Sequence, residues 1–288
     1  MFFKTNNLAE TWDMGIKGLY SCLKSYALPV SLENEKPLVI GLDAYPFLYK
    51  YREDIDSCIT VLKQFQGAGH ILILYLDGVP PKEKEAELLN RKIQKEAAYK
   101  QAKALKAFLN DDKSKELTED ARNIIARQIA SYEHESWYLR KEIRETFALR
   151  VSQEGIEVIQ CKGEADTDLI QASLSKKLDC VIANDMDLFV GGVERLWMLG
   201  KTQTDPLLQE FRRSYVSYEV GLTDKSWIDV AILAGYEKCP ELKRCSAHQA
   251  IIWIRYYGSI ESLLSRRHDL LQGVKLKDFQ DARQHLTF

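Results

Sequence analysis

Four short apolar runs stand out along the chain, and acidic residues follow each of them. The runs cover residues 37–42, 70–76, 156–161 and 179–184. Runs that are apolar at nearly every position are typical of strands buried on both faces, as in a parallel sheet. Amphipathic helical patterns over 44–66 and 165–177 separate these runs. The alternation of strands and helices predicts an α/β fold with right-handed crossovers.

A long polar segment interrupts this alternation. From Pro80 to about Arg150 the chain is rich in charged residues and helix formers, and it is too long for an ordinary crossover. Thr118, followed by two acidic residues, predicts a new helix start. We therefore expect a helical excursion from the sheet. Residues 82–106 hold eight Lys or Arg against four Glu, which fits either a solvated helical face or a nucleic-acid contact.

The chain changes character after Gly200. Residues 201–221 have the pattern of a loop or partly ordered connection, whereas helical patterns cover 227–234, 246–257 and 259–267. We expect three parts: a flexible N-terminal extension (1–13), an α/β domain (14–221) that includes the helical excursion of about 80–150, and a C-terminal helical subdomain (222–288).

The composition is that of an ordinary globular protein. Of the 288 residues, 45% are hydrophobic and 10% aromatic, which excludes disordered and fibrous classes. With 40 basic and 42 acidic residues the net charge is −2, so only a local face of the protein can be basic. The six cysteines form no C-x-x-C pair, and no apolar run approaches the ~18 residues of a membrane span. We expect an intracellular protein with reduced thiols and no membrane association.

Carboxylates follow four successive predicted strands. They are Asp43, Asp77, Glu164, Asp166, Asp185 and Asp187. A single Asp after a strand usually caps the next helix. In an open parallel sheet, however, the carboxyl ends of the strands share one crevice, where we expect these six groups to meet. So many negative charges need compensation, and oxygen ligands without His or Cys favour Mg²⁺ or Mn²⁺. Two such ions can assist phosphodiester hydrolysis.

Six motifs occur in a recognisable order along the chain. They are MGIKGL (14–19), LDA (42–44), YLDGVPP (75–81), GEAD (163–166), NDMDL (184–188) and WIDVAILAG (227–235). With these motifs the chain resembles the XPG-type structure-specific 5′ nucleases, and most closely their flap endonuclease branch, from Met14 to about Arg267. The resemblance implies a PIN-like nuclease fold, in which helices flank a mostly parallel central sheet. It also implies a helical arch insertion and a helix-turn-helix-like C-terminal subdomain that binds duplex.

The resemblance also implies roles for individual residues. The metal ligands would be Asp43, Asp77, Glu164, Asp166, Asp185, Asp187 and Glu237, the last in place of an Asp in the family. Lys84 and Arg91 match the two basic residues that hold the scissile phosphate at the base of the arch, and Tyr49 matches an aromatic residue on which a terminal base stacks. We expect the nucleic-acid contacts to come from Tyr49, Lys84, Arg91, Lys92, Lys95, Lys243 and Arg244. The family's Gly-rich hairpin is replaced here by residues 239–245, which contain no glycine.

The expected function is that of a metal-dependent 5′ flap endonuclease or 5′–3′ exonuclease in DNA repair or replication. Two Mg²⁺ or Mn²⁺ ions would serve as cofactors, and branched or 5′-ended DNA would be the partner of a monomeric enzyme. No sliding-clamp motif is evident at the C-terminus. Two alternatives stay open: an RNA-cleaving endoribonuclease of the same superfamily, and a catalytically degenerate module that binds nucleic acid or protein. The intact carboxylate set argues against the degenerate module, because uncompensated anions would be costly to retain.

Overall fold

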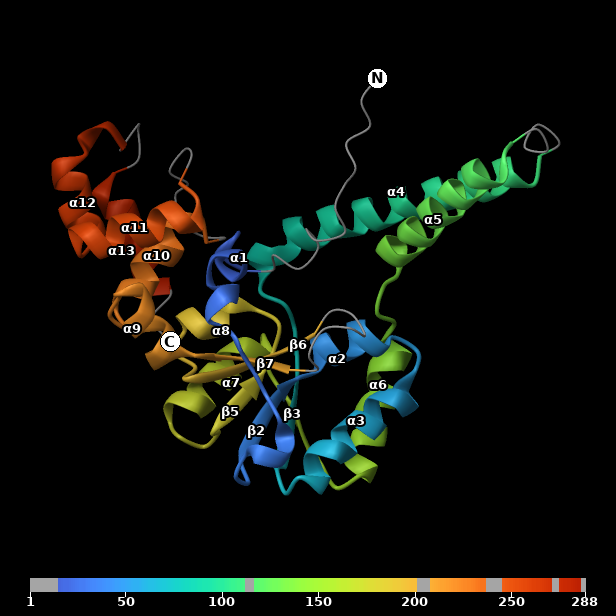
Figure 1. The fold of residues 1–288 in the computed structure, drawn as a ribbon, viewed down its shortest axis with the longest axis horizontal. Helices are drawn as coiled ribbons and strands as arrows, with labels where there is room; N and C mark the ends of the chain where they lie inside the picture. Colours follow the sequence, from blue (N-terminus) through green and yellow to red (C-terminus); the bar gives the residue numbers. More distant parts are fainter. Residues whose placement is uncertain (1–14, 112–116, 201–207, 237–244, 271–274, 286–288) are drawn as a thin grey trace. The chain divides into compact units, whose positions relative to one another are not determined.

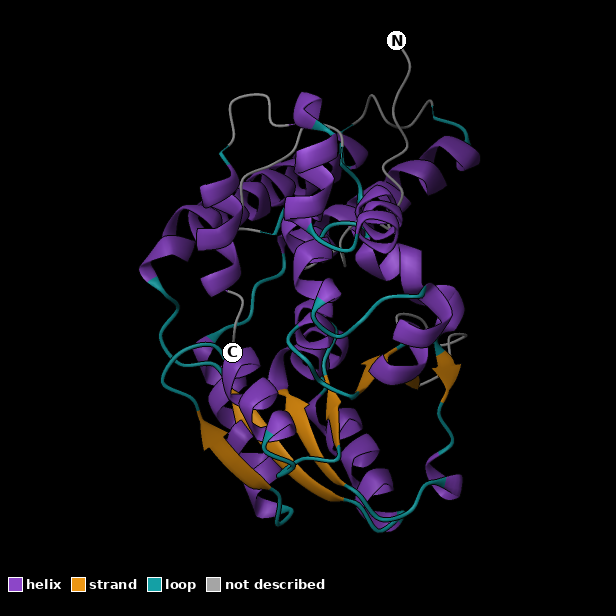
Figure 2. Ribbon diagram, turned by 90° about the vertical axis from the view of Figure 1, so that its left-hand side faces the viewer, coloured by secondary structure: helices purple, strands orange, loops and turns teal. Residues whose placement is uncertain are grey.

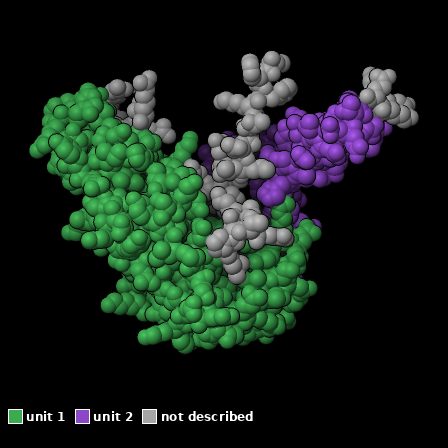
Figure 3. Space-filling model, viewed as in Figure 1, with its two compact units in different colours: residues 1–78, 147–288 green, residues 79–146 purple. Residues whose placement is uncertain are grey.

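The computed structural model describes residues 15–111, 117–200, 208–236, 245–270 and 275–285. The chain forms two compact units (Figure 3). One unit is made from residues 1–78 and 147–288, and the other from residues 79–146. The first unit holds the central sheet, and the second unit is the predicted helical insertion.

A sheet of seven strands lies at the centre of the first unit (Figure 2). The order across the sheet is β1-β7-β6-β5-β2-β3-β4, and the four neighbouring pairs from β6 to β4 are parallel. The other two pairs are antiparallel: β7 runs antiparallel to β6, and β1 runs antiparallel to β7. The mostly parallel sheet predicted from the sequence is therefore confirmed. The strands are β1 (Leu28–Pro29), β2 (Val39–Asp43), β3 (Ile71–Leu76), β4 (Glu157–Gln160), β5 (Cys180–Ile182), β6 (Arg195–Leu199) and β7 (Leu208–Arg212).

The chain reverses its direction across the sheet between β2 and β5. From β2 the strands β3 and β4 follow on one side, whereas β5 and β6 continue on the other side. The two central strands are in register with Leu42 opposite Ile182, one residue before Asp43. In open α/β sheets such a reversal point opens a crevice at the carboxyl ends of the strands. The acidic residues after β2 and β5 lie at this point.

The helix predicted over residues 44–66 is two helices, α2 and α3. The chain breaks at Arg52, which has a φ of 54° and ends α2. The carboxylate of Asp54 then accepts a hydrogen bond from the backbone N–H of Ser57 at 3.1 Å and begins α3. The hydrophobic period continues across this break, which is why the sequence pattern predicted a single helix.

The helices and 3₁₀ turns of this unit are α1 (Leu19–Leu23), η2 (Lys24–Tyr26), η3 (Leu32–Asn34), α2 (Ala44–Tyr51), α3 (Ile55–Gly67), α7 (Ala165–Leu174), α8 (Met186–Val190), α9 (Arg213–Val220), α10 (Ser226–Ala234), α11 (Ala247–Tyr257), α12 (Ile260–Arg266), η6 (His268–Leu270) and α13 (Leu276–His285).

The prediction of a connection over residues 201–221 is wrong from Leu208 onward, where β7 and α9 form. A charged residue in the middle of β7 hid this strand. Glu210 is only 5% exposed, and its carboxylate accepts hydrogen bonds from the side chains of Arg195 and Trp197 on β6. A buried carboxylate is tolerated where such partners compensate it. Both of these partners come from another strand, so local sequence could not reveal them, although Arg212 on β7 itself also donates to Glu210 at 3.1 Å.

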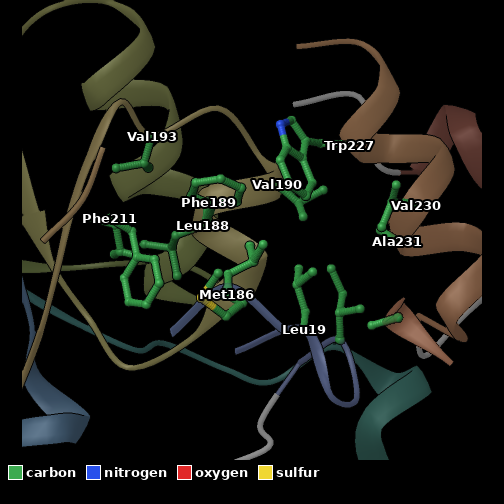
Figure 4. Packing of buried hydrophobic residues seen from close by; sticks show 14 of the residues in the cluster. Leu19, Met186, Leu188, Phe189, Val190, Val193, Phe211, Trp227, Val230 and Ala231 are labelled. Carbon is green, nitrogen blue, oxygen red and sulfur yellow. The ribbon is translucent and has the colours of Figure 1, made fainter. Parts of the chain in front are cut away.

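One hydrophobic core joins the sheet to the C-terminal helices (Figure 4). The α8 helix lies in the middle of this core. The ring of Phe189 on α8 packs edge to face on Trp227 of α10, with ring centroids 4.9 Å apart. On the other side, Leu19 of α1 belongs to the same cluster. The helix that follows Asp185 is thus held by packing from both ends of the chain.

The second unit is a pair of long helices, α4 (Glu85–Leu109) and α5 (Glu119–Ser136), after the 3₁₀ turn η4 (Lys82–Lys84). The two helices lie side by side (Figure 1) and bury Ala98, Ala102 and Ile129. Thr118 begins α5, because its hydroxyl accepts a hydrogen bond from the Ala121 N–H at 3.3 Å, so the predicted helix start is confirmed. The next helix, α6 (Lys141–Gln153), begins in this unit and ends in the first. Among the described residues, no helix combines the length and apolar character that a membrane crossing requires.

Candidate active site

Asp43 ends β2 at the carboxyl edge of the sheet and begins α2. Its Oδ1 accepts a hydrogen bond from the backbone N–H of Tyr45 at 3.0 Å. The side chain is buried, with 9% of the residue exposed. The helix start therefore fixes the direction of this carboxylate.

Asp77 follows β3 and is tied to the loop after β4. Its Oδ1 accepts a hydrogen bond from the backbone N–H of Ala165 at 2.7 Å, the residue next to Glu164. The Gly78 N–H donates to the carbonyl of Gly163 at 2.7 Å. A Cβ on Gly78 would lie 2.2 Å from a backbone carbonyl oxygen of this loop, so only glycine permits the close approach. The two loops that carry Asp77 and Glu164 are held together as one edge.

Asp185 and Asp187 lie at the start of α8, after β5. The Oδ1 of Asp185 accepts a hydrogen bond from the Asp187 N–H at 2.8 Å. The Oδ1 of Asp187 in turn accepts one from the Ile16 N–H at 3.1 Å. Gly15 has a φ of +82°, and a Cβ on it would lie 2.2 Å from Asp185 Oδ1 and 2.3 Å from Asp187 Oδ1. The backbone at Gly15 thus packs directly against both carboxylates.

Five predicted aspartates lie close enough to influence one another's ionisation. Burial, together with the charges of Asp77 and Asp185, raises the pKa of Asp43 to about 7, against the lowering effect of the Tyr45 N–H. Removal from water and the charges of Asp185, Asp43, Asp187 and Asp77 raise the pKa of Asp166 well above its usual range. The structure therefore brings residues from four strand ends into one region of concentrated negative charge.

The chemistry of these groups fits a hard divalent cation. The clustered donors are carboxylate oxygens, which Mg²⁺ and Mn²⁺ prefer. Cys161 lies near Asp43 and Asp77, but burial raises the pKa of its thiol to about 12, so it stays protonated at neutral pH. Within the described part of the chain, no three His, Cys, Asp or Glu side chains are already arranged around one point as metal ligands. The fit rests on the type of donor and on the buried negative charge.

Tyr49 lies on α2, in the same unit as the carboxylates. Its ring stacks on that of Tyr45, with ring centroids 6.1 Å apart and an interplanar angle of 25°. Both side chains are half-buried. An aromatic surface therefore begins within two residues of Asp43 along α2.

Four predicted basic residues lie in the helical insertion. Lys84 ends η4, and Arg91, Lys92 and Lys95 lie on the first half of α4. Arg91 forms an i,i+4 ion pair with Glu87. Partial burial, with a contribution from the charge of Arg91, lowers the pKa of Lys95. The insertion thus carries a row of basic residues along one stretch of helix.

Three further predicted residues, Glu237, Lys243 and Arg244, lie outside the described residues.

Comparison with known proteins identifies the relatives of this chain. The XPG I-region family matches residues 155–237, the segment that holds the acidic residues after β4 and β5. Flap endonuclease 1 of Entamoeba histolytica is 26% identical over an alignment that covers 94% of this chain and 75% of the relative. Flap endonuclease 1-A of Oryza sativa subsp. japonica is 25% identical, with coverages of 94% and 74%. The chain is similar to the XPG-type, flap endonuclease-like nucleases.

Solved structures support the fold of this flap endonuclease-like chain. The catalytic core of Rad2 superposes with a TM-score of 0.62 at 17% identity, over 95% of this chain and 78% of that one. Flap endonuclease-1 from Methanococcus jannaschii gives a TM-score of 0.59 at 17% identity, over 91% and 81% of the two chains. The PIN-like α/β fold predicted from the sequence is confirmed.

The sequence did not identify two side chains that join the strand ends carrying the carboxylates in this flap endonuclease-like chain. The Nε2 of Gln160 donates to the carbonyl oxygens of Asp77 at 2.7 Å and of Leu76 at 3.2 Å, and so joins the ends of β4 and β3. The Oδ1 of Asn184 accepts a hydrogen bond from the Leu199 N–H at 2.8 Å and joins the ends of β5 and β6. The sequence signal that could have found them is a polar residue within or at the end of a buried apolar run, as Gln160 and Asn184 are.

Proposed function

We propose that this chain is a metal-dependent, structure-specific 5′ nuclease that hydrolyses phosphodiester bonds in branched or 5′-ended DNA. The observation that carries the proposal is the gathering of five aspartates at the carboxyl ends of four strands, where burial and the neighbouring aspartates raise the pKa of Asp43 to about 7. Fixed negative charge of this density is costly unless cations compensate it. The names of the relatives, which are flap endonucleases, agree with this use of the site.

Within this proposal, the carboxylates bind two Mg²⁺ or Mn²⁺ ions. The ligands are Asp43, Asp77, Glu164, Asp166, Asp185, Asp187 and Glu237. When bound, such ions polarise the phosphodiester and stabilise the attacking and leaving oxygens. The backbone N–H groups of Tyr45, Ala165 and Ile16 orient their carboxylates, as outer hydrogen bonds do for ligands in metal sites.

The basic residues and Tyr49 are the proposed substrate contacts. Lys84 and Arg91 hold the scissile phosphate, whose charge grows during the reaction, so they act mainly in the transition state. Lys92, Lys95, Lys243 and Arg244 contact the nucleic-acid backbone, and Tyr49 stacks on a base.

The proposed domain organisation places the nuclease domain at residues 14–221, including the arch of about 80–150. Residues 222–288 bind duplex DNA, and residues 1–13 are an extension outside this machinery.

The direct test uses labelled 5′-flap, nicked and single-stranded DNA, together with a matching RNA flap, each with Mg²⁺, Mn²⁺ or a chelator. We expect flap cleavage that the chelator abolishes and that Asp185→Asn reduces at least a hundredfold, which is about 2.7 kcal/mol of transition-state stabilisation. Glu157→Gln is the matched control, because Glu157 is an exposed carboxylate at the opposite end of the sheet. Cleavage of RNA alone would establish the endoribonuclease alternative. Binding without cleavage in either metal would establish the binding module.

A second experiment tests the basic pair. Lys84→Ala and Arg91→Ala should lower the single-turnover rate by more than they weaken substrate binding. Lys103→Ala on the exposed surface of the same helix is the control and should change neither quantity. Weaker binding with an unchanged cleavage rate would instead assign the pair to electrostatic steering.

A further inference from the structure

A stacked pair of tyrosines lies at the start of α2, beside the carboxylate cluster. The rings of Tyr45 and Tyr49 are close to parallel, at 25°, with centroids 6.1 Å apart. Offset, nearly parallel stacking is a preferred arrangement of two aromatic rings. Both side chains are half-buried, so each ring keeps part of its surface accessible. The pair is one turn of helix long, with Tyr45 nearer to the carboxylates.

The backbone of Tyr45 joins this aromatic pair to the site. Its N–H donates to Asp43 Oδ1 at 3.0 Å, while its ring packs on Tyr49. The same residue therefore holds a proposed metal ligand with its backbone and a proposed stacking ring with its side chain. Because the hydrogen bond to Asp43 comes from the backbone, the ring can be removed without removing that bond.

The charge around the pair indicates which part of a substrate it can take. The nearby aspartates repel phosphate groups, so an anion is disfavoured there unless cations are bound. A nucleobase is uncharged, has two flat faces and stacks on tyrosine rings irrespective of sequence. The pair is therefore suited to a base rather than to the backbone of a nucleic acid.

We propose that Tyr45 is a positioning residue that holds the ring of Tyr49 in the orientation in which it stacks on a nucleobase next to the cleaved bond. The proposal rests on the proposed nuclease function and deepens it. The enzyme would require a base, and not only a phosphate, at that nucleotide.

Cleavage of two matched flap substrates tests this requirement. One carries normal bases at the two nucleotides that flank the cleaved bond, and the other carries abasic residues there. Tyr45→Ala should lower the single-turnover rate on the normal substrate about tenfold, whereas it should leave the rate on the abasic substrate unchanged. Tyr45→Phe keeps the ring and should retain the wild-type rate. Adding Tyr49→Ala to Tyr45→Ala should cause little further loss, since both act through one contact.

A binding experiment separates this proposal from the nuclease function. A flap with 2-aminopurine at the same nucleotide, bound in Ca²⁺, should lose fluorescence when its base stacks. Wild type and Tyr45→Phe should quench it, and Tyr45→Ala should not. Tyr218→Ala, which removes an 83% exposed ring on α9, is the control and should behave as wild type. The Tm of each variant, measured by thermal unfolding, shows whether a lost signal comes from loss of the fold.

Each outcome has one consequence. Equal losses on normal and abasic substrates, or a loss with Tyr45→Phe as large as with Tyr45→Ala, overturn the positioning role and leave the nuclease function intact. Quenching by wild type without any cleavage overturns the nuclease function and supports the stacking surface. Absence of quenching by wild type overturns the stacking surface, whether or not cleavage occurs.

Discussion

The backbone N–H of Ile16 donates a hydrogen bond to Oδ1 of Asp187 at 3.1 Å, although 171 residues separate them in the chain. The contact places the first described turn of the chain against α8. It is possible only because the preceding residue, Gly15, has no Cβ to collide with Asp185 and Asp187. Gly15 and Ile16 are therefore part of the proposed active site.

Gly15→Ala should damage this contact. Its new Cβ would lie within 2.3 Å of the Asp185 and Asp187 carboxylates, which must shift. We expect at least a tenfold loss of cleavage rate, about 1.4 kcal/mol. Gly18→Ala is the matched control, because Gly18 has a similar φ of +78° but no atom within 4 Å of the added Cβ. The control should lose ~1–2 kcal/mol of unfolding free energy to backbone strain and keep its rate. Equal rates for the two variants would contradict the close contact.

Asp43→Asn should separate activity from stability. The change removes a buried charge near Asp77 and Asp185 and keeps an oxygen for the Tyr45 N–H. We expect cleavage to be lost, while the Tm of the metal-free protein rises by roughly 2–4 °C for each kcal/mol of repulsion relieved. Calorimetry without metal and a flap assay with Mg²⁺ measure the two effects. A lower Tm would show that the carboxylate stabilises the fold rather than strains it.

His70 should make the protein sensitive to mild acid. Its Nδ1 accepts a hydrogen bond from the Leu38 N–H at 3.2 Å, and burial lowers its pKa; Arg195 adds to this effect and Glu35 opposes it. The unfolded chain therefore takes up a proton below about pH 6.5 before the folded protein does. Stability is full above that pH and falls as the pH drops toward the folded-state value.

Urea unfolding at pH 7.5 and 5.5 measures this dependence. His70→Gln should lower stability at pH 7.5 by roughly 1–3 kcal/mol, because the half-buried Leu38 N–H loses its usual partner, but should reduce the further loss at pH 5.5. His248→Gln, a change at an exposed position of α11, should keep the wild-type pH dependence. A steep dependence that persists without His70 would assign it to other groups.

Arg283 should be essential for the C-terminal helices. It binds Asp229, a 5% exposed carboxylate that also accepts a hydrogen bond from the Ile260 N–H at 3.1 Å, and it pairs with Glu261 at 2.8 Å. Arg283→Ala leaves the Asp229 charge buried without this partner, and we expect a loss of about 3 kcal/mol of unfolding free energy. Arg267→Ala, which removes an exposed pair with Asp269, should cost far less because solvent screens that pair. Denaturant unfolding of both variants tests the difference.

The contacts of Asp229 with Arg283 and Ile260 argue against a role for Asp229 as a metal ligand. Its carboxylate is engaged by Arg283 and Ile260, so it serves the packing of α10, α12 and α13. Asp229→Asn should therefore lower stability without raising the Mg²⁺ concentration needed for half-maximal cleavage. Glu237→Gln should raise that concentration if Glu237 is a ligand. A raised requirement in Asp229→Asn instead would assign the last ligand to Asp229.

The sequence alone determined the four parallel strands that build the site. Each is a short apolar run that ends in an acidic motif, and this pattern depends only on which neighbours along the chain are apolar. Parallel strands share one crevice at their carboxyl ends whatever their order across the sheet, and that order came only from the structure. For that reason the sequence alone assigns Asp43, Asp77 and Asp185 to one edge of the sheet.

Only the tertiary structure decided how these groups are held and charged. The raised pKa of Asp43, the hydrogen bond from Ile16 to Asp187 and the buried position of Glu210 in β7 all depend on partners far away in the chain. Burial and hydrogen-bond pairing depend on tertiary packing, and a local sequence pattern does not show which distant residue will be the partner. The residue types therefore predict the chemistry of the site, whereas the fold sets its protonation and orientation.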